Sequence, residues 1–331
     1  MGASSSLMNK TELSIWTFVV ALFGLLAIAA NLSVLVAFFS QKCLRRSPSN
    51  YFAINLTISD ICVVVGPMPL WLLNMWHIHS RLSFKERGVI PVNKLHRYTI
   101  AWQALDSVLV NVSVCSLAFL SIERCIAATK PLFHRRHISK KLMANACLFP
   151  WFYAFAALSP TMVLKDTLHI LTCKVVVISI PCLVIIAAYT VLLKEIRSMS
   201  KRFRAADGAF PCTRSSVMRR KRNMNLALRS SLLTIAFLLC WLPYVSWAIW
   251  CVNPGNYSSL RPSTFMHITM PIKFLSYFNS LLNPFLYVMG RPAFLLVFKE
   301  ALCKSSYKKY VRRRMQQTAF PSAVVATQHT F

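Results

Sequence analysis

The sequence predicts an all-α membrane protein, a seven-transmembrane helix bundle followed by a short amphipathic eighth helix. Three observations lead to this prediction. Of the 331 residues, 56% are hydrophobic and 14% are charged, whereas about 25% are charged in a soluble domain. Seven apolar runs are each long enough to cross a hydrocarbon core of roughly 30 Å as a helix. The lysines and arginines between these runs are concentrated on one side of the predicted membrane.

The predicted helices follow one another in a single domain. In chain order, the apolar runs are residues 13–39, 49–76, 99–128, 142–164, 174–197, 226–252 and 265–289. We therefore expect one bundle domain over residues 13–303, with an extracellular tail at 1–12 and a cytoplasmic tail at 304–331. The basic segment 198–222 contains a glycine and a proline, so we expect it to form a flexible loop.

A short amphipathic helix is predicted after the seventh run. Pro292 suits the first turn of a helix, and the phenylalanine and leucine side chains of residues 291–302 would lie in the membrane interface. Cys303 follows this segment, and a cysteine near a membrane is a candidate for palmitoylation, with a free thiol as the alternative. Near the other end of the chain, Asn9 begins an N-glycosylation sequon and is a predicted acceptor.

The distribution of positive charge predicts the topology. Of the 38 lysines and arginines, 28 fall on one side of the predicted membrane: three in Lys42–Arg46, six in Arg124–Lys141, eleven in Lys194–Arg229 and eight from Arg291 onward. This bias places the N-terminus outside and the C-terminus in the cytoplasm. The net charge of +29 therefore reflects membrane topology and attraction to anionic lipids rather than binding to nucleic acid.

The sequence offers no basis for catalysis. Neither a nucleophile with a neighbouring base nor a set of metal ligands is recognisable in it, so we expect that the protein is not an enzyme. Most of the 11 cysteines lie within apolar runs. There they are expected to pack as small hydrophobic side chains rather than to form a disulfide framework.

The seventh run contains Asn283-Pro284 and, three residues later, Tyr287. Proline removes a backbone hydrogen bond and kinks a helix. Such a break is tolerated in a membrane only where neighbouring groups or water satisfy the freed carbonyls. We therefore expect this segment to lie inside the bundle beside a polar cavity and to be able to bend.

A few ionisable side chains lie within the runs. Placing a charge inside a membrane costs free energy, so such residues are taken as functional by default. They are Asp60, Asp106, Glu123, Arg124 and Lys273. Asp106 and Arg124 are 18 residues apart, which is five helical turns, so they share one helix face about 27 Å apart. The third run thus carries an anion near its outer end and a cation at its inner end.

Four oxygen-bearing side chains can converge halfway across the membrane. They are Asp60, Ser113, Asn279 and Asn283. The last two are four residues apart and therefore lie on one helix face. Hard oxygen ligands suit a small cation, so these residues predict a sodium site. The alternative is a hydrated polar network without an ion, and no other cofactor is expected.

Polar and aromatic motifs occur in a fixed order along the seven runs. They are Asn31, Asn55-Leu56, Ser59-Asp60, Glu123-Arg124-Cys125, Trp151, Pro181 with Tyr189, Phe237-x-x-Cys240-Trp241-Leu242-Pro243-Tyr244, and Asn283-Pro284-x-x-Tyr287. With these motifs, residues 13–303 resemble a rhodopsin-like (class A) G-protein-coupled receptor. The pattern is closest to that of the biogenic-amine receptors, in particular the histamine and muscarinic receptors.

The resemblance implies a receptor of the plasma membrane that activates heterotrimeric G proteins when an extracellular ligand shifts its conformational population. Arrestin and a receptor kinase are further implied partners. Arg124 would pair with Glu123 at rest and reach into the G-protein groove in the active state. The resemblance assigns the remaining switch residues as Tyr189, Pro243, Asn283, Pro284 and Tyr287.

The resemblance also implies a ligand site. Asp106 stands where biogenic-amine receptors have their amine-binding aspartate. An ammonium ion is stabilised by a carboxylate and by aromatic faces. The other implied ligand residues are Trp102, Asn111, Trp241, Tyr244 and Tyr277, and Lys273 is a further candidate because it lies one turn from Tyr277 on the same helix face.

Four departures from the family pattern affect this interpretation. Lys273 lies one turn from Tyr277 and could pair with Asp106 and neutralise the site. A lysine at this position would suit an acidic ligand rather than an amine. Thr99 stands where the family has the disulfide-forming cysteine of helix three, and the loop between helices four and five is very short. The inner end of helix six has no acid to hold Arg124, so we expect a weak resting lock and measurable basal activity.

Alternatives to an amine receptor remain at this point. One is a receptor for a peptide or an acidic ligand that uses Lys273. Another is a seven-helix transporter or channel, although the sequence lacks the repeats or paired broken helices of many transporters. A third is a receptor-like protein that has lost its response to a ligand. Replacing Asp106 or Lys273 would separate the ligand hypotheses.

Overall fold

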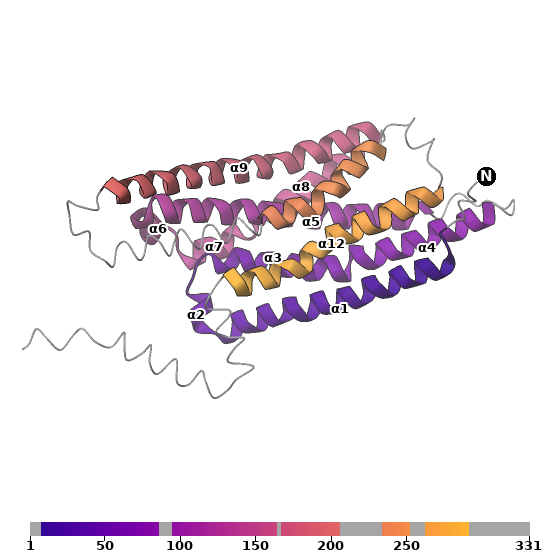
Figure 1. The fold of residues 1–331 in the computed structure, drawn as a ribbon, viewed down its shortest axis with the longest axis horizontal. Coiled ribbons are helices and arrows are strands. Elements are labelled where there is room, and N and C mark those ends of the chain that lie inside the picture. The colour runs from indigo at the N-terminus through magenta and orange to yellow at the C-terminus, as the bar shows by residue number, and fades with distance from the viewer. Residues whose placement is uncertain (1–7, 86–94, 164–166, 206–233, 252–261, 291–331) are drawn as a thin grey trace, which may run out of the picture.

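The computed structural model describes residues 8–85, 95–163, 167–205, 234–251 and 262–290, and the regular structure in these ranges is helical. The labelled helices are α1 (Lys10–Ser40), α2 (Lys42–Arg45), α3 (Asn50–Val65), α4 (Pro67–Lys85), α5 (Leu95–Thr129), α6 (Pro131–His137), α7 (Lys140–Ala146), α8 (Phe149–Val163), α9 (Thr167–Ala205) and α12 (Pro262–Gly290). A further helix spans Thr234–Cys251. The long helices lie side by side in an elongated bundle, with α1 and α9 on opposite sides and α5 between them (Figure 1).

Six stretches of the described chain are long and apolar enough to cross a membrane. They are Lys10–Ser40, Asn50–Ser80, Thr99–Thr129, Lys140–Ser159, Cys173–Glu195 and Thr234–Cys251. The seventh predicted run corresponds to α12, whose 29 residues also suffice in length and which packs against α1 and α3. It is less apolar because it carries a row of buried polar side chains, including Lys273, Asn279 and Asn283.

The helix boundaries differ from the prediction in several places, including α4, which continues to Lys85, and α9, which already begins at Thr167. The second predicted run is two helices, α3 and α4, because Pro67 has no backbone N–H to continue the ladder and Gly66 takes a non-helical conformation between them. The fourth run is likewise divided into α7 and α8. Helix α9 continues to Ala205, so the first part of the segment predicted as a flexible loop, residues 198–205, is helical.

Other predicted features lie outside the described residues. They are the amphipathic helix, Cys303, the cytoplasmic tail and most of the basic loop. Asn9 is described, and its side chain caps α1: its Oδ1 accepts from the backbone of Thr11, and Glu12 accepts from the backbone N–H of Asn9. This capping box was not predicted, and it leaves the glycosylation prediction untested.

Helix α5 is the central helix of the bundle. In its most apolar part 78% of residues are buried, against 17% for Thr234–Cys251. It packs against α3, α4, α8 and α9, and its apolar side chains contribute to the larger hydrophobic clusters. Because α5 is surrounded, its polar residues near both ends, Asp106 and Arg124, are buried in the protein rather than exposed to lipid.

Buried polar side chains link the helices to one another. Asn31 on α1 donates to the carbonyl of Ser280 on α12 at 2.9 Å. Asn55 on α3 donates to Ser116 on α5 at 2.8 Å and accepts from the indole of Trp151 on α8 at 2.9 Å. These contacts give a structural role to three residues that carried the family resemblance, and they determine how the helices pack around α5.

Candidate functional site

A buried ion pair joins α5 and α12. The Lys273 Nζ lies 2.7 Å from the Asp106 Oδ2. The lysine is fully buried and the aspartate is 7% exposed. The two residues are 167 positions apart in the chain, so only the packing of α12 beside α5 brings them together. The pairing that the sequence left open is therefore present in the structure.

Four aromatic rings surround the Lys273 ammonium. Its Nζ lies 4.1 Å from the ring centroid of Tyr244, 4.6 Å from Tyr277, 4.8 Å from Trp241 and 5.6 Å from Trp102. The Trp102 indole also donates to the Tyr277 hydroxyl at 3.0 Å. These are the aromatic residues predicted to enclose an external amine. In the structure they enclose an ammonium group of the protein itself.

A cavity of about 260 Å³ lies beside the ion pair. It is formed by α5, α9 and the helix Thr234–Cys251. The residues that line it are Gln103, Asp106, Ser107, Val110, Asn111, Lys174, Val175, Ile178, Trp241, Tyr244, Val245, Ala248 and Ile249. Of the seven predicted ligand residues, Asp106, Asn111, Trp241 and Tyr244 line this cavity. The other three, which are Trp102, Lys273 and Tyr277, are buried and do not belong to its lining.

Lys174 is a cavity residue that the sequence analysis did not assign. It lies on α9 and is partly buried. The available signal was a lysine within a predicted transmembrane run, which is unusual enough to mark function. Its direction toward α5 depends on the rotation of α9, and the sequence does not determine that rotation.

A second polar cluster lies deeper in the bundle, between α3, α5 and α12. The Asn283 amide donates to the Asp60 Oδ2 at 2.8 Å, and the hydroxyls of Ser59 and Ser113 are 3.1 Å apart. A cavity of about 10 Å³, close to the space of one water molecule, is lined by residues that include Asp60, Ser113 and Asn279. The Oδ1 atom of Asn279 is buried without a hydrogen-bond partner.

This small cavity fits part of the predicted sodium site. Asp60, Ser113 and Asn279 line it, and they carry a carboxylate, a hydroxyl and an amide oxygen without a hydrogen-bond partner; such oxygen ligands suit a small hard cation. Asn283 is not among the lining residues. Its amide donates to Asp60, so it orients the carboxylate rather than lining the cavity.

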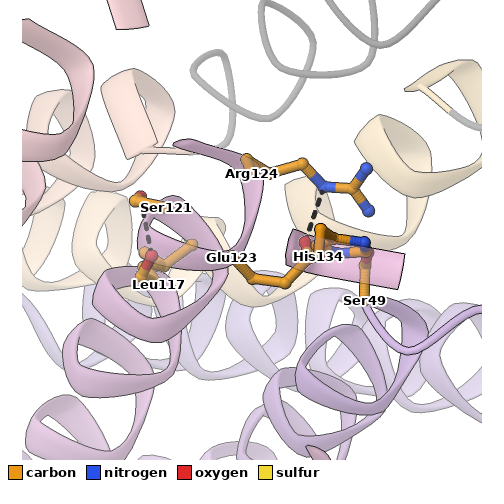
Figure 2. A network of polar contacts seen from close by, with 6 residues as sticks. All are labelled: Ser49, Leu117, Ser121, Glu123, Arg124 and His134. Carbon is orange, nitrogen blue, oxygen red and sulfur yellow. Dashed lines mark hydrogen bonds and ion pairs between the residues drawn. The ribbon is translucent and has the colours of Figure 1, made fainter. Parts of the chain in front are cut away.

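The other end of α5 carries a network centred on Glu123, shown in Figure 2. The Arg124 Nε lies 3.2 Å from the Glu123 Oε2, close enough for an ion pair but not aligned for a hydrogen bond. The Oε1 atom of Glu123 accepts from the Ser49 hydroxyl at 2.7 Å and contacts the His134 Nε2 at 2.6 Å. Glu123 is therefore held from three sides.

Ser49 and His134 were not predicted. Ser49 precedes α3 and His134 lies in the short helix α6, and no sequence motif places either residue next to Glu123. Among the other predicted switch residues, Tyr189 contacts the Thr234 hydroxyl at 3.2 Å and so connects α9 to the helix Thr234–Cys251. Pro243 lies within the latter helix, and Pro284 and Tyr287 lie within α12.

Comparison with known proteins identifies the family. Residues 30–170 and 165–287 match the family described as 7 transmembrane receptor (rhodopsin family). The chain is 24% identical to a melanopsin of Podarcis siculus over 86% of this chain and 60% of the relative. It is also 24% identical to 5-hydroxytryptamine receptor 4 of Cavia porcellus, over 84% of this chain and 77% of the receptor.

A third relative, the type-1 angiotensin II receptor A of Xenopus laevis, is 25% identical over 82% of this chain and 72% of the relative. These three relatives are named as an opsin, an amine receptor and a peptide receptor. The family match confirms the predicted seven-helix fold class and the prediction that the protein is a receptor and not an enzyme. The order of the motifs, the packing around α5 and this match establish that the chain belongs to the rhodopsin family of seven-transmembrane receptors.

Proposed function

We propose that the protein is a cell-surface receptor that binds a small ligand in the 260 Å³ cavity and activates heterotrimeric G proteins. The observation that carries this proposal is the position of the two polar sites on the central helix. Asp106 lines the cavity near one end of α5, and the Glu123–Arg124 pair lies near the other. A ligand that changes the packing around Asp106 acts on the same rigid helix that holds Arg124.

Two classes of ligand are compatible with the cavity. An amine is supported by Asp106 in its lining and by relatives named for 5-hydroxytryptamine and octopamine. A ligand with an acidic group is favoured by a different observation, because Lys273 already neutralises Asp106. Separating the partners of a buried ion pair costs about 3–5 kcal/mol, and an amine that replaces Lys273 would have to overcome this cost.

The proposed location is the plasma membrane, with the N-terminus outside and the cytoplasmic end of α5 facing the G protein. The asymmetry of lysine and arginine along the chain supports this orientation. Arrestin, a receptor kinase and anionic lipids are proposed as further partners. Glycosylation of Asn9 and palmitoylation of Cys303 are proposed modifications on the outer and inner sides.

The function is tested by nucleotide exchange on purified G proteins, using membranes from cells with and without the receptor. We expect exchange above the control level without ligand. We also expect a response to a panel of biogenic amines or of organic acids. Replacing Arg124 with alanine should abolish both signals, because it removes the side chain proposed to contact the G protein. Exchange equal to that of receptor-free membranes for every G protein and every ligand would refute the function.

A sodium ion bound by Asp60, Ser113 and Asn279 is proposed as part of the resting state. Any ligand that binds only the folded protein stabilises it, so we expect a higher unfolding temperature in sodium chloride than in potassium chloride of equal concentration. Replacing Asp60 with asparagine keeps the size of the side chain and should remove the difference. Equal unfolding temperatures in the two salts for the unmodified protein would contradict the sodium site.

A further inference from the structure

We infer that the cavity binds a small organic anion, with a carboxylate on an aromatic body, and that Lys174 is its counter-ion. The inference rests on the proposed function only in that the occupant of this cavity is the receptor's ligand. It resolves the choice between the two ligand classes, and it assigns a binding role to a residue of α9.

The charges around the cavity do not cancel. Asp106 is the acidic residue among the described residues that line it, and its charge is matched by Lys273 at 2.7 Å. Lys174 lines the same cavity. Its charge is attracted by Asp106 and repelled by Lys273. No ion pair of Lys174 is present among the described residues, so the described lining together with Lys273 carries one more positive than negative charge.

A cationic ligand would be repelled by this excess positive charge, and the Asp106 carboxylate that could bind it is already paired with Lys273. To take over the Asp106 Oδ2 atom, an ammonium would have to displace Lys273 from a position within 6 Å of four aromatic rings. The loss of a buried ion pair corresponds to about 100-fold or more in affinity. An anion avoids this loss because it pairs with Lys174 and leaves the Asp106–Lys273 pair intact.

The remaining wall of the cavity describes the body of the ligand. Most of it is apolar or aromatic and is supplied by residues such as Ile178, Trp241 and Val245. The Asn111 amide group donates to the Ser107 carbonyl at 2.9 Å, and the Oδ1 atom of Asn111 is buried without a partner. An unpaired buried acceptor is costly, so a ligand beside Asn111 that donates to this oxygen, after the amide turns toward the cavity, is favoured.

These features fit an aromatic acid with a hydrogen-bond donor on its ring. Asn111 lies five residues from Asp106, which is about 7.5 Å along α5. A carboxylate near the charged end and a ring hydroxyl or ring N–H near Asn111 would span this distance. The cavity of about 260 Å³ is small beside typical pockets of roughly 300–1,000 Å³, which favours one or two fused rings.

The test uses pairs of probes that share a ring and differ in charge. They are 4-hydroxyphenylacetate with tyramine, and indole-3-acetate with tryptamine. The unfolding temperature of the purified full-length receptor in lipid nanodiscs is measured against the concentration of each probe. We expect at least one acid to raise the unfolding temperature at a concentration tenfold or more below that of its matched amine.

Substitutions on α9 identify the counter-ion. Replacing Lys174 with glutamine should raise the concentration of acid required by tenfold or more, whereas replacing it with arginine should largely preserve binding. Lys194 lies on the same helix, is exposed and is not part of the cavity. The change Lys194→Gln is therefore the matched control, and it should leave acid binding unchanged. The unfolding temperature without probe shows whether each variant folds.

The inference is overturned if an amine stabilises the receptor at lower concentrations than its matched acid. It is also overturned if none of the acids stabilises it, or if an acid acts equally on the Lys174→Gln variant. Nucleotide exchange separates this result from the proposed function. Acids that bind without altering nucleotide exchange would support the anion site and count against G-protein coupling through this cavity. Basal exchange without any acid binding would support G-protein coupling and count against the anion site.

Discussion

Replacing Lys273 with methionine is expected to destabilise the receptor by about 3–5 kcal/mol, because it leaves the buried carboxylate of Asp106 without its partner. Methionine has a similar length and fills the aromatic enclosure, so the loss reflects charge rather than packing. The measurement is the thermal unfolding of the purified receptor, together with the amount of protein that reaches the cell surface.

The partner substitutions make this prediction specific. Replacing Asp106 with asparagine should cost less, since four aromatic rings still face the Lys273 ammonium. The double variant Asp106→Asn with Lys273→Met should regain much of the stability that Lys273→Met loses, because neither position of the buried pair then carries a charge without its partner. If Lys273→Met unfolds at the temperature of the unmodified receptor, the ion pair does not contribute to stability in the way we describe.

Replacing Glu123 with glutamine is expected to raise basal nucleotide exchange on the G protein by about tenfold. The change removes the charge that holds Arg124 at 3.2 Å but retains an oxygen that can accept from Ser49 and His134. Close charge pairs away from solvent have coupling energies of about 1.5–7 kcal/mol, and about 1.4 kcal/mol corresponds to a factor of ten in an equilibrium, so the expected effect lies at the lower end of this range. The conformational equilibrium should shift accordingly toward the state with Arg124 released.

A matched change at the same carboxylate provides the control. Replacing Ser49 with alanine removes one hydrogen bond to Glu123 and leaves the ion pair with Arg124 in place. We expect a smaller increase in basal exchange than for Glu123→Gln, at equal surface expression. An unchanged or lower basal rate for Glu123→Gln would show that the Glu123–Arg124 pair does not restrain the resting state.

The sequence alone predicted the architecture because hydrocarbon imposes simple constraints on composition. Segments that cross it must be long and apolar, and basic residues gather on one side. The helix ends were less predictable. The break at Gly66, next to Pro67, and the extension of α9 to Ala205 depend on local backbone hydrogen bonding, which an apolar count does not register.

The sequence also identified most of the polar residues that form the site, because an ionisable or amide side chain within an apolar run is conspicuous. It could not say what those residues contact. Ser49 and His134 were missed as partners of Glu123 because they lie in connecting segments, where a polar residue is ordinary. Lys174 was not assigned a role, because the direction of its side chain depends on how α9 is rotated against α5.

By itself, the sequence determined that this protein is a seven-helix membrane receptor with Asp106 and Arg124 near opposite ends of its third transmembrane helix. The tertiary structure alone decided that Lys273 occupies the aromatic enclosure and neutralises Asp106, and that Lys174 is left facing the cavity. The physical reason is that hydrophobicity and charge bias act along the chain. Ion pairs and cavities instead depend on distances between residues of separate helices, and these distances are set by packing.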